Sequence, residues 1–478
     1  MNYVVKGRKP EALFAFFEQI SAIPRPSYHE AAVADYLERF AKERGLYCYR
    51  DKTHNVLIKK PASAGMEDRP PILFQGHTDM VCEKNSGVEH DFLRDPLKLW
   101  VDGKLLRAKG TTLGADNGIA VAIMLALLDG AAERHPAMEC LFTSAEEVGL
   151  DGANAFDYSL ISARRMVNMD SEALGTVTCG CAGGVRSDLT LQYRTEPFSG
   201  EAICVRISGL MGGHSGEHIN RGRANANKLM GRLLAALNTE GTWNLVTLDG
   251  GSKDNAIPRE CVATVAVEDA ARATDILTET AAAIARELSC EDRGFTVAVE
   301  DAEQADVMLS REDTVRVAAL LSSASNGVLA MSRDIEGLVE FSRNLGVVKT
   351  DGTTVKFVFS ARSAKESQLD AAMQELDVLA LALGFATHHH NRYPGWDFAA
   401  VSPLRDSYLK AYATVVGEDA NVNAIHAGLE CGIISSKISG MDIIAVGPNM
   451  FDIHSPDEAL DLDSTEVLWK IISNMLAQ

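Results

Sequence analysis

The chain has 478 residues, of which 46% are hydrophobic and 23% charged, a composition typical of a globular protein with two or three domains. Its 66 acidic and 46 basic residues give a formal net charge of −20, which argues against nucleic acid or an anionic membrane as a partner. We recognise no signal peptide and no membrane-spanning segment, and the nine scattered cysteines are typical of reduced thiols, so we expect a cytoplasmic protein.

The first elements lead to a polar segment that follows a buried strand. Apolar spacing predicts helices at residues 11–20 and 29–44, with Ser27 and Glu30 placed as in a capping box before the second. An apolar run then predicts a strand that ends in Gln75-Gly76-His77-Thr78-Asp79-Met80. Alternate residues of an extended chain point to the same side, so the Asp79 carboxylate can orient the His77 imidazole.

Acidic residues stand at the start of the next helix and at the ends of two more strands. Asp116 precedes an alanine- and leucine-rich helix, where it fits either an N-cap or a ligand role. Residues 138–143 predict a strand that ends before Glu146 and Glu147, and a strand at 165–168 ends before Asp170. Alternating strands and helices predict a largely parallel sheet, in which ligands bind beyond the carboxyl ends of the strands.

The pattern changes from about residue 187 to alternating strands with fewer helices. We expect an inserted α+β domain at 187–399, built from two similar halves, within a three-layer α/β domain formed by 1–186 and 400–478. A weak sequence similarity suggests the two halves. It relates Asn255-Ala256-Ile257-Pro258 to Asn344-Leu345-Gly346-Val347, and each segment is expected to precede a strand. Residues 388–390, three consecutive histidines, predict a polar strand or loop rather than a metal site, because three adjacent side chains do not all face one ion.

The last part of the chain returns to the α/β pattern. A glycine-containing turn region is expected at 423–432, then a buried strand at 443–447, the polar segment that contains His454, and a closing helix at 464–477. The polar residues that follow strand ends or adjoin them are His77, Asp79, Asp116, Glu146, Glu147, Asp170 and His454.

Five carboxylates at one edge of a sheet would repel each other, and one or two divalent cations would remove that cost. Mixed imidazole and carboxylate ligands suit zinc, and also cobalt or manganese. Five ligands with one bridging aspartate match a two-metal hydrolase. Glu146 and Glu147 are adjacent, so one can bind metal while the other serves as general base.

These segments resemble a family of hydrolases. The segments 75–80, 115–118, 145–149, 168–172 and 453–456 occur in the order and spacing of the co-catalytic zinc aminopeptidases and carboxypeptidases of the aminoacylase/carboxypeptidase-G type. Gly212-Gly213-His214-Ser215-Gly216, Ser342-Arg343-Asn344-Leu345-Gly346 and His426-Ala427-Gly428-Leu429-Glu430-Cys431-Gly432 resemble one branch, the bacterial aminoacyl-histidine dipeptidases, relatives of the carnosinases.

The resemblance implies a role for each residue of the metal site. His77 and Asp170 would bind one zinc, Glu147 and His454 the other, and Asp116 would bridge them. The bond between Asp116 and Asn117 is expected to be cis. Asp79 would orient His77, and Glu146 would deprotonate the bridging water and later protonate the leaving amine.

The inserted domain resembles the lid and dimerisation domain of the family, which implies a homodimer. His214 resembles the lid histidine that stabilises the oxyanion of the tetrahedral intermediate. Asn255, Arg343, Arg362 and His426 are candidates for substrate contacts. A dipeptide carboxylate favours an arginine, and the sequence leaves the choice between Arg343 and Arg362 open. Arg362 departs from the family pattern because it follows Ser360-Ala361 instead of an aspartate.

The resulting expectation is metal-dependent hydrolysis of unblocked dipeptides, preferentially Xaa-His dipeptides such as carnosine, by a water between two metal ions with Glu146 as base. Two alternatives remain open. One is a related amidohydrolase, either an N-acyl amino acid deacylase or a tripeptide exopeptidase. The other is a non-catalytic metal-binding homologue, against which the presence of Glu146 argues.

Overall fold

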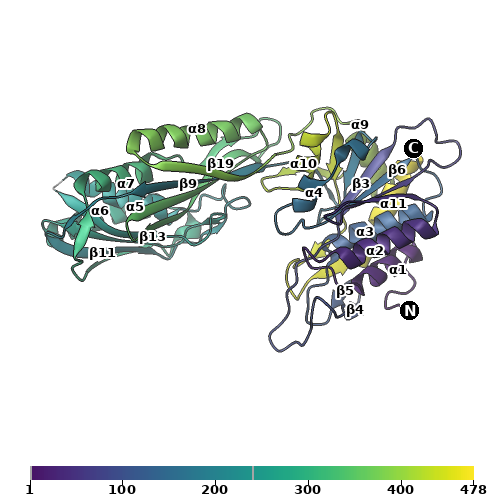
Figure 1. The fold of residues 1–478 in the computed structure, drawn as a ribbon, viewed down its shortest axis with the longest axis horizontal. Coiled ribbons are helices and arrows are strands. Elements are labelled where there is room, and N and C mark those ends of the chain that lie inside the picture. Colours follow the sequence, from purple (N-terminus) through teal and green to yellow (C-terminus); the bar gives the residue numbers. More distant parts are fainter. Residues whose placement is uncertain (1–2, 240–241) are drawn as a thin grey trace. The chain divides into compact units, whose positions relative to one another are not determined.

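The computed structural model describes residues 3–239 and 242–478, and the chain divides into two compact units (Figure 1). The first unit comprises Met1–Gly180, Trp396–Ala424 and Leu429–Gln478, and the second comprises Cys181–Gly395 and Ile425–Gly428. The predicted boundaries at 186/187 and 399/400 stay a prediction. His426 lies in the segment that returns from the first unit to the second.

The first unit contains α1 (Glu11–Ser21), α2 (Ala31–Glu43), α3 (Ala115–Asp129), α4 (Asp151–Ala155), α9 (Pro403–Val416), α10 (Glu430–Lys437) and α11 (Leu462–Ala477). Its main sheet contains β1 (Tyr47–Arg50), β2 (Val56–Lys60), β3 (Ile72–His77), β6 (Met138–Thr143), β7 (Arg165–Asn168), β8 (Thr176–Cys181), β22 (Asn421–Ile425) and β23 (Asp442–Ala445). A smaller sheet contains β4 (Leu99–Asp102), β5 (Leu105–Ala108), β24 (Met450–Phe451) and β25 (Ala459–Asp461).

The main sheet is mixed, in the order β1-β2-β6-β3-β7-β23-β8-β22. Its central strands β6, β3, β7 and β23 run parallel, and antiparallel strands flank them. Strand β3 is buried along its whole length, as a central strand covered on both faces requires. Ile72 and Phe74 pack with α1, α3 and α11 in one core, whereas the alternate residue Leu73 is buried outside that core, on the other face. The predicted α/β class is confirmed.

The second unit contains α5 (Ala226–Ala236), α6 (Ala270–Ala285), α7 (Arg311–Ser323) and α8 (Glu366–Leu383). Its large sheet contains β9 (Gly183–Gln192), β11 (Glu201–Ser208), β13 (Trp243–Gly250), β15 (Cys261–Val267), β16 (Thr296–Asp301), β18 (Gly327–Met331), β19 (Val339–Asp351), β20 (Thr354–Ser363) and β21 (Ala386–Tyr393). Two short pairs are β10 (Thr195–Pro197) with β17 (Val307–Leu309), and β12 (Gly213–His214) with β14 (Ala256–Ile257).

The large sheet of the second unit is antiparallel in all its described pairs, and α5 to α8 pack on it through one shared core (Figure 1). The predicted inserted α+β domain is therefore confirmed. The three consecutive histidines lie on β21, as predicted for a polar strand.

Three local predictions are wrong. Ser27 does not cap α2, which begins at Ala31; its hydroxyl donates to Asp79 instead. The segment 423–432 is not a continuous turn region, because β22 occupies its beginning and α10 starts at Glu430. Asn344-Leu345-Gly346-Val347 lies inside β19 rather than before a strand. Its sequence similarity to residues 255–258 therefore does not mark equivalent positions in two halves.

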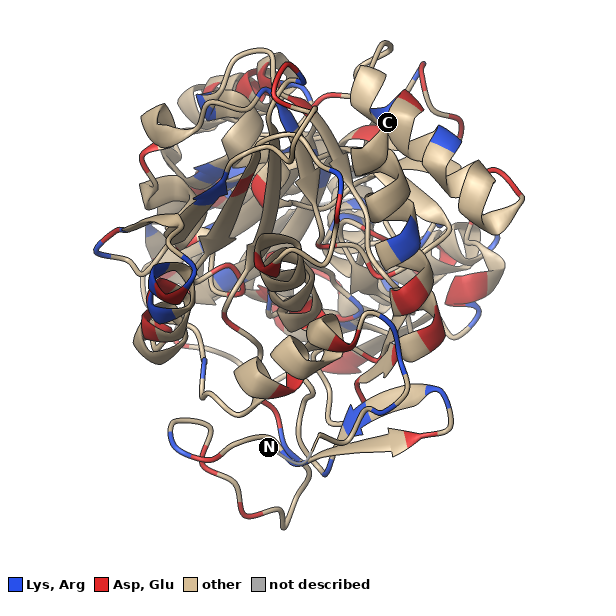
Figure 2. Cartoon of the chain, turned by 90° about the vertical axis from the view of Figure 1, so that its right-hand side faces the viewer, with Lys and Arg blue, Asp and Glu red and all other residues tan. Residues whose placement is uncertain are grey.

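No helix among the described residues combines the length and the apolar character that crossing a membrane needs. On the face that Figure 2 shows, Lys and Arg are interspersed with Asp and Glu and are not gathered on one element.

Candidate metal centre

Three adjacent parallel strands deliver polar side chains to one edge of the main sheet. His77 is the last residue of β3, and Asp79 follows two residues later. Glu146 and Glu147 follow β6, and Asp170 follows β7. Because β6, β3 and β7 are neighbours in the sheet, their carboxyl ends place these residues side by side.

Asp116 and His454 come from outside the main sheet. Asp116 lies in the first turn of α3 with a non-helical backbone, and the peptide bond between Asp116 and Asn117 is cis, as predicted. The carboxylate does not cap the helix, so the alternative of a simple N-cap is wrong. His454 lies between β24 and β25 in the left-handed region, with φ 61°.

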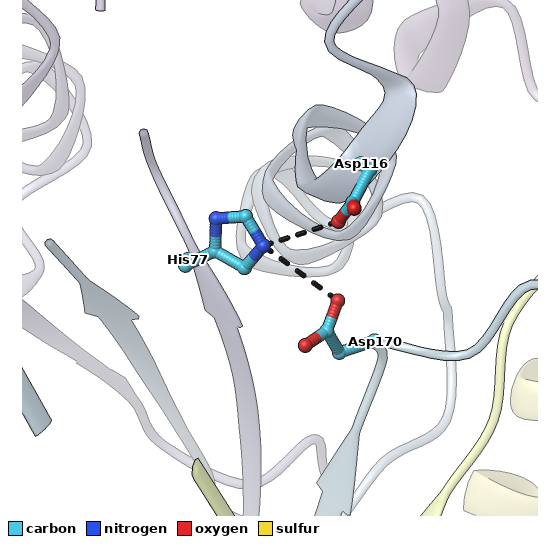
Figure 3. A group of neighbouring side chains, drawn as sticks. All are labelled: His77, Asp116 and Asp170. Atoms are coloured by element: carbon cyan, nitrogen blue, oxygen red, sulfur yellow. Dashed lines mark hydrogen bonds and ion pairs between the residues drawn. The ribbon is translucent and has the colours of Figure 1, made fainter. Parts of the chain in front are cut away.

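Asp116 stands between two groups of potential ligands. Its Oδ1 lies 3.1 Å from His77 Nε2, and that nitrogen lies 3.6 Å from Asp170 Oδ1 (Figure 3). On the other side, Asp116 Oδ2 lies 3.1 Å from His454 Nε2, which lies 3.1 Å from Glu147 Oε1. The ligand atoms of each group lie within 4.8 Å of one another. The structure thus brings the five predicted ligands together, with Asp116 common to both groups.

Glu146 stands next to this arrangement. A third group of potential ligand atoms within 4.8 Å of one another consists of His77, Glu146 and Glu147. Burial raises the pKa of Glu146 well above its usual value, and Asp170 acts in the same direction against the opposing effect of His77. A carboxyl group with a raised pKa beside a ligand cluster is suited to exchange protons.

The charges of the centre fit divalent cations. Burial raises the pKa of Asp116, but hydrogen bonds with His454 and His77 outweigh it and hold this pKa below its usual value. Hydrogen bonds with Asp116 and Glu147 raise the pKa of His454 to about 10. Positive charge is thus favoured among these crowded carboxylates, and divalent cations would supply it in a metal site. The set of imidazole and carboxylate donors suits such ions.

Asp79 holds the strand ends together. Its Oδ1 faces His77 Nδ1 at 3.3 Å and accepts from the backbone N–H of Glu146, at 3.1 Å. Its Oδ2 accepts from the backbone N–H of Glu147, at 3.2 Å, and from the Ser27 hydroxyl, at 2.8 Å. Asp79 is therefore placed as predicted, beside His77, and it also fixes the backbone of both glutamates.

Two residues that hold the Asp116 segment were not found by sequence reasoning. Buried Glu458 accepts hydrogen bonds from four consecutive backbone N–H groups, of residues 113–116, at 2.7 to 3.3 Å. The fully buried Arg25 guanidinium donates to the carbonyl oxygens of Thr78, Asp79 and Gly114. Both act on backbone groups, which leave no motif in the sequence.

In the second unit, the predicted oxyanion residue His214 lies close to two of the predicted substrate-contact residues, Arg362 and His426. The backbone carbonyl of His426 and the ring of His214 both lie close to Gly216. Burial lowers the pKa of both His214 and His426, and the nearby charge of Arg362 lowers both further. Together these effects lower the pKa of His426 to about 3. Arg362 donates to the Tyr393 hydroxyl at 3.0 Å, and the Ser342 hydroxyl lies 2.7 Å from His426 Nε2.

The other two candidates differ in their surroundings. Asn255 directly precedes β14, the partner strand of His214, and its carbonyl accepts from the backbone N–H of Ser215 at 2.9 Å. Arg343 is fully buried; it forms an ion pair with Glu375 at 2.9 Å and donates to Ser325 and to the Ala372 carbonyl. The structure therefore separates Arg343 from the His214 group and commits its guanidinium to contacts within the fold.

Comparisons with known proteins agree with this geometry. The peptidase dimerisation domain pattern matches residues 205–290, and the pattern of peptidase family M28 matches residues 55–188. The cytosol non-specific dipeptidase of Escherichia coli (strain K12) is 38% identical over 478 residues, which cover 98% of each chain.

Solved structures show the same relationship over the whole chain. The aminoacylhistidine dipeptidase from Vibrio alginolyticus superposes with a TM-score of 0.94 at 36% identity, covering 98% of this chain and 97% of that chain. Aminopeptidase PepT from Bacillus cereus ATCC 10987 shares the fold, with a TM-score of 0.56 at 16% identity over 98% of this chain and 99% of that chain. The chain therefore belongs to the M20 metallopeptidase family that includes these two dipeptidases.

Proposed function

We propose that this protein is a metal-dependent dipeptidase that hydrolyses unblocked dipeptides, with Xaa-His dipeptides such as carnosine among its substrates. The observation that carries this proposal is Asp116, whose two carboxylate oxygens each lie 3.1 Å from a histidine of a different ligand group. The names of the E. coli and Vibrio relatives support dipeptides as the substrate class.

The proposed assignment of ligands follows the two groups. His77 and Asp170 would hold one ion, Glu147 and His454 would hold the other, and Asp116 would contact both. Zinc fits this donor set best, and cobalt or manganese would also fit. Two such ions would polarise the peptide carbonyl and lower the pKa of a water held with them.

Glu146 is the proposed general base. Its carboxylate takes the proton of the attacking water and passes it to the nitrogen of the leaving amino acid as the peptide bond breaks. The neighbouring Glu147 is held by His454 at 3.1 Å, so the two adjacent carboxylates have different surroundings and can serve different roles. Asp79 keeps both in place through their backbone N–H groups.

The His214 group is proposed to bind the substrate. Arg362 would hold the free carboxylate of the dipeptide, because it lies beside His214 and His426 and its fork geometry suits a carboxylate. Arg343, bound to Glu375, is assigned a structural role instead. His214 would stabilise the oxyanion, and Asn255 and His426 would contact the rest of the substrate.

The matched dimerisation domain supports a further proposal, that the protein acts as a homodimer through its second unit. The name of the E. coli relative supports a cytoplasmic location. The names of the two relatives differ on breadth, since one is called non-specific and the other aminoacylhistidine dipeptidase. Substrate preference is therefore the property to measure first.

The test is a hydrolysis panel on zinc-loaded protein, with and without a chelator. It contains carnosine, Gly-His, Ala-Ala, a tripeptide and an N-acetylated amino acid. Chelator-sensitive cleavage of the dipeptides is expected, and cleavage of Ala-Ala beside Gly-His would indicate broad specificity. Cleavage of only the acetylated substrate or only the tripeptide would replace the proposal with the deacylase or the exopeptidase. Metal binding without any cleavage would favour a non-catalytic homologue.

A further inference from the structure

Glu430 is a fully buried carboxylate that has no role in the site as described so far. It is the first residue of α10. Its Oε2 accepts hydrogen bonds from Gln75 Nε2, at 2.5 Å, and from the Thr143 hydroxyl, at 2.8 Å. A buried carboxylate is costly unless such bonds compensate its lost hydration. The role of Glu430 therefore depends on what its two donors, Gln75 and Thr143, hold in place.

The two donors belong to a network that spans three neighbouring strands. Gln75 lies on β3, and Thr143 ends β6. Gln75 Oε1 in turn accepts from Asn168 Nδ2 on β7, at 2.7 Å, and Gln75 and Asn168 are directly paired in the register of β3 and β7. One carboxylate therefore connects side chains of β6, β3 and β7.

Each strand of this network leads directly into the metal centre. Gln75 precedes His77 by two residues, so in an extended strand both side chains point to the same side. Asn168 precedes Asp170 by two residues, and its Oδ1 accepts from the Asp170 backbone N–H at 3.2 Å. Thr143 pairs with His77 in the register of β3 and β6. The network thus forms a layer of hydrogen bonds immediately beneath the ligands.

We propose that Glu430 is a positioning residue of the metal centre. Through Gln75 and Thr143 it fixes the relative placement of the three strand ends that carry His77, Asp170 and the two glutamates. This inference rests on the proposed metal centre, although not on the identity of the substrate. Ligands in metal sites depend on such supporting partners, whose removal typically weakens metal binding by roughly 10- to 100-fold.

The experiment compares Glu430→Ala and Glu430→Gln with a matched control, Glu139→Ala. Glu139 is also a buried carboxylate and lies on the same strand β6, but it accepts from the backbone N–H groups of Ser162 and Ala163 and pairs with Lys59. The hydrogen bonds and the ion pair described for Glu139 all lie outside the network of Glu430. Zinc affinity is measured by competition with a chelator, and Tm is measured on the metal-free proteins.

Glu430→Ala is expected to weaken zinc binding by roughly 10- to 100-fold. Glu430→Gln should restore most of the affinity, because its amide oxygen accepts from the same two donors. Glu139→Ala should lower Tm and leave zinc affinity unchanged. Unchanged zinc affinity in Glu430→Ala would overturn the proposal, and so would an equal loss in Glu139→Ala.

A milder variant keeps the proposal testable if Glu430→Ala does not fold. Thr143→Val removes one donor at nearly constant volume, and a smaller loss of zinc affinity is expected; no loss would count against the proposal. The absorption spectrum of the cobalt-loaded variants gives a second readout of ligand geometry. Hydrolysis by the parent protein is assayed in parallel, so a failed substrate proposal remains distinguishable from a failed role of Glu430.

Discussion

The backbone N–H of Glu146 donates a hydrogen bond to the Asp79 carboxylate, with 3.1 Å between nitrogen and Oδ1. The same oxygen lies 3.3 Å from His77 Nδ1, so one atom serves both a proposed ligand and the proposed base. Asp79→Asn is therefore expected to lower kcat by roughly 10- to 100-fold, because an amide has one acceptor oxygen and its NH2 group cannot accept the second backbone hydrogen bond. Steady-state kinetics with metal analysis tests this, and an unchanged kcat would contradict the arrangement.

The two adjacent glutamates should respond differently to the same substitution. Glu146→Gln is expected to lower kcat by at least roughly 100-fold while two ions per chain are retained, because it removes the base and leaves the ligands. Glu147→Gln is the matched control and should lose one ion. Metal content and kcat of both variants are measured under identical loading. Retained turnover in Glu146→Gln would exclude it as the base.

Replacing Asp116 should remove more bound ions than replacing Asp170. Asp116 contacts both histidines, whereas Asp170 lies near His77. Asp116→Ala is therefore expected to abolish binding of both ions, and Asp170→Ala to abolish one. Metal analysis after dialysis against zinc measures the difference. Equal losses in the two variants would show that Asp116 does not bridge.

Protons and metal should compete for His454. Its pKa in the metal-free fold is raised to about 10 by hydrogen bonds with Asp116 and Glu147. A histidine ligand must be neutral, so zinc displaces this proton and zinc affinity should rise with pH up to about 10. His454→Ala should flatten this dependence, and a pH-independent affinity in the parent would contradict the competition.

In the metal-free protein, the contribution of His454 to stability should fall as the pH rises, whereas zinc affinity should rise. A folded-state pKa above the unfolded value of about 6.5 stabilises the fold fully below that value. This contribution of His454 is lost as the pH rises toward about 10. Urea unfolding of the metal-free parent and of His454→Ala should therefore differ at low pH and converge at high pH. A difference that grows with pH would be the wrong sign.

Replacing Arg362 should chiefly affect substrate binding, whereas replacing Arg343 should chiefly affect stability. Arg362→Ala is expected to raise KM by roughly 10- to 100-fold with little change in Tm, since a charge-assisted hydrogen bond to a carboxylate is lost. Arg343→Ala removes a buried partner of Glu375 and should chiefly lower Tm. Kinetics and thermal unfolding of both variants test the assignment, and the reverse outcome would exchange the two roles.

The residues of the candidate metal centre could be grouped from the sequence because their signal is local. His77, Glu147 and Asp170 each follow a short apolar strand, and the rule for parallel sheets places such strand ends at one edge. Asp116 and His454 joined the same set as polar residues at a helix start and after the last strand, and the role of each ligand came from the family resemblance. The α/β class and the inserted α+β domain followed from the change in strand and helix pattern.

Supporting residues could not be predicted because their partners are distant in sequence. Glu458 accepts from backbone groups more than 340 residues away, and Glu430 binds Gln75 across 355 residues. Ser27 shows the opposite error: a local capping pattern was present, but a tertiary bond to Asp79 took the hydroxyl. Local patterns do not reveal which of two competing hydrogen-bond partners the folded chain selects.

The bond between Glu458 and the segment of residues 113–116 has a consequence for synthesis of the chain. The carboxylate that holds the backbone of Asp116 follows it in the chain by 342 residues. His454 lies in the same late segment. During translation the three strand ends emerge long before this segment does, and domains generally fold as their residues become available. A nascent chain stalled before residue 454 should therefore carry a largely formed sheet edge that cannot yet retain two ions.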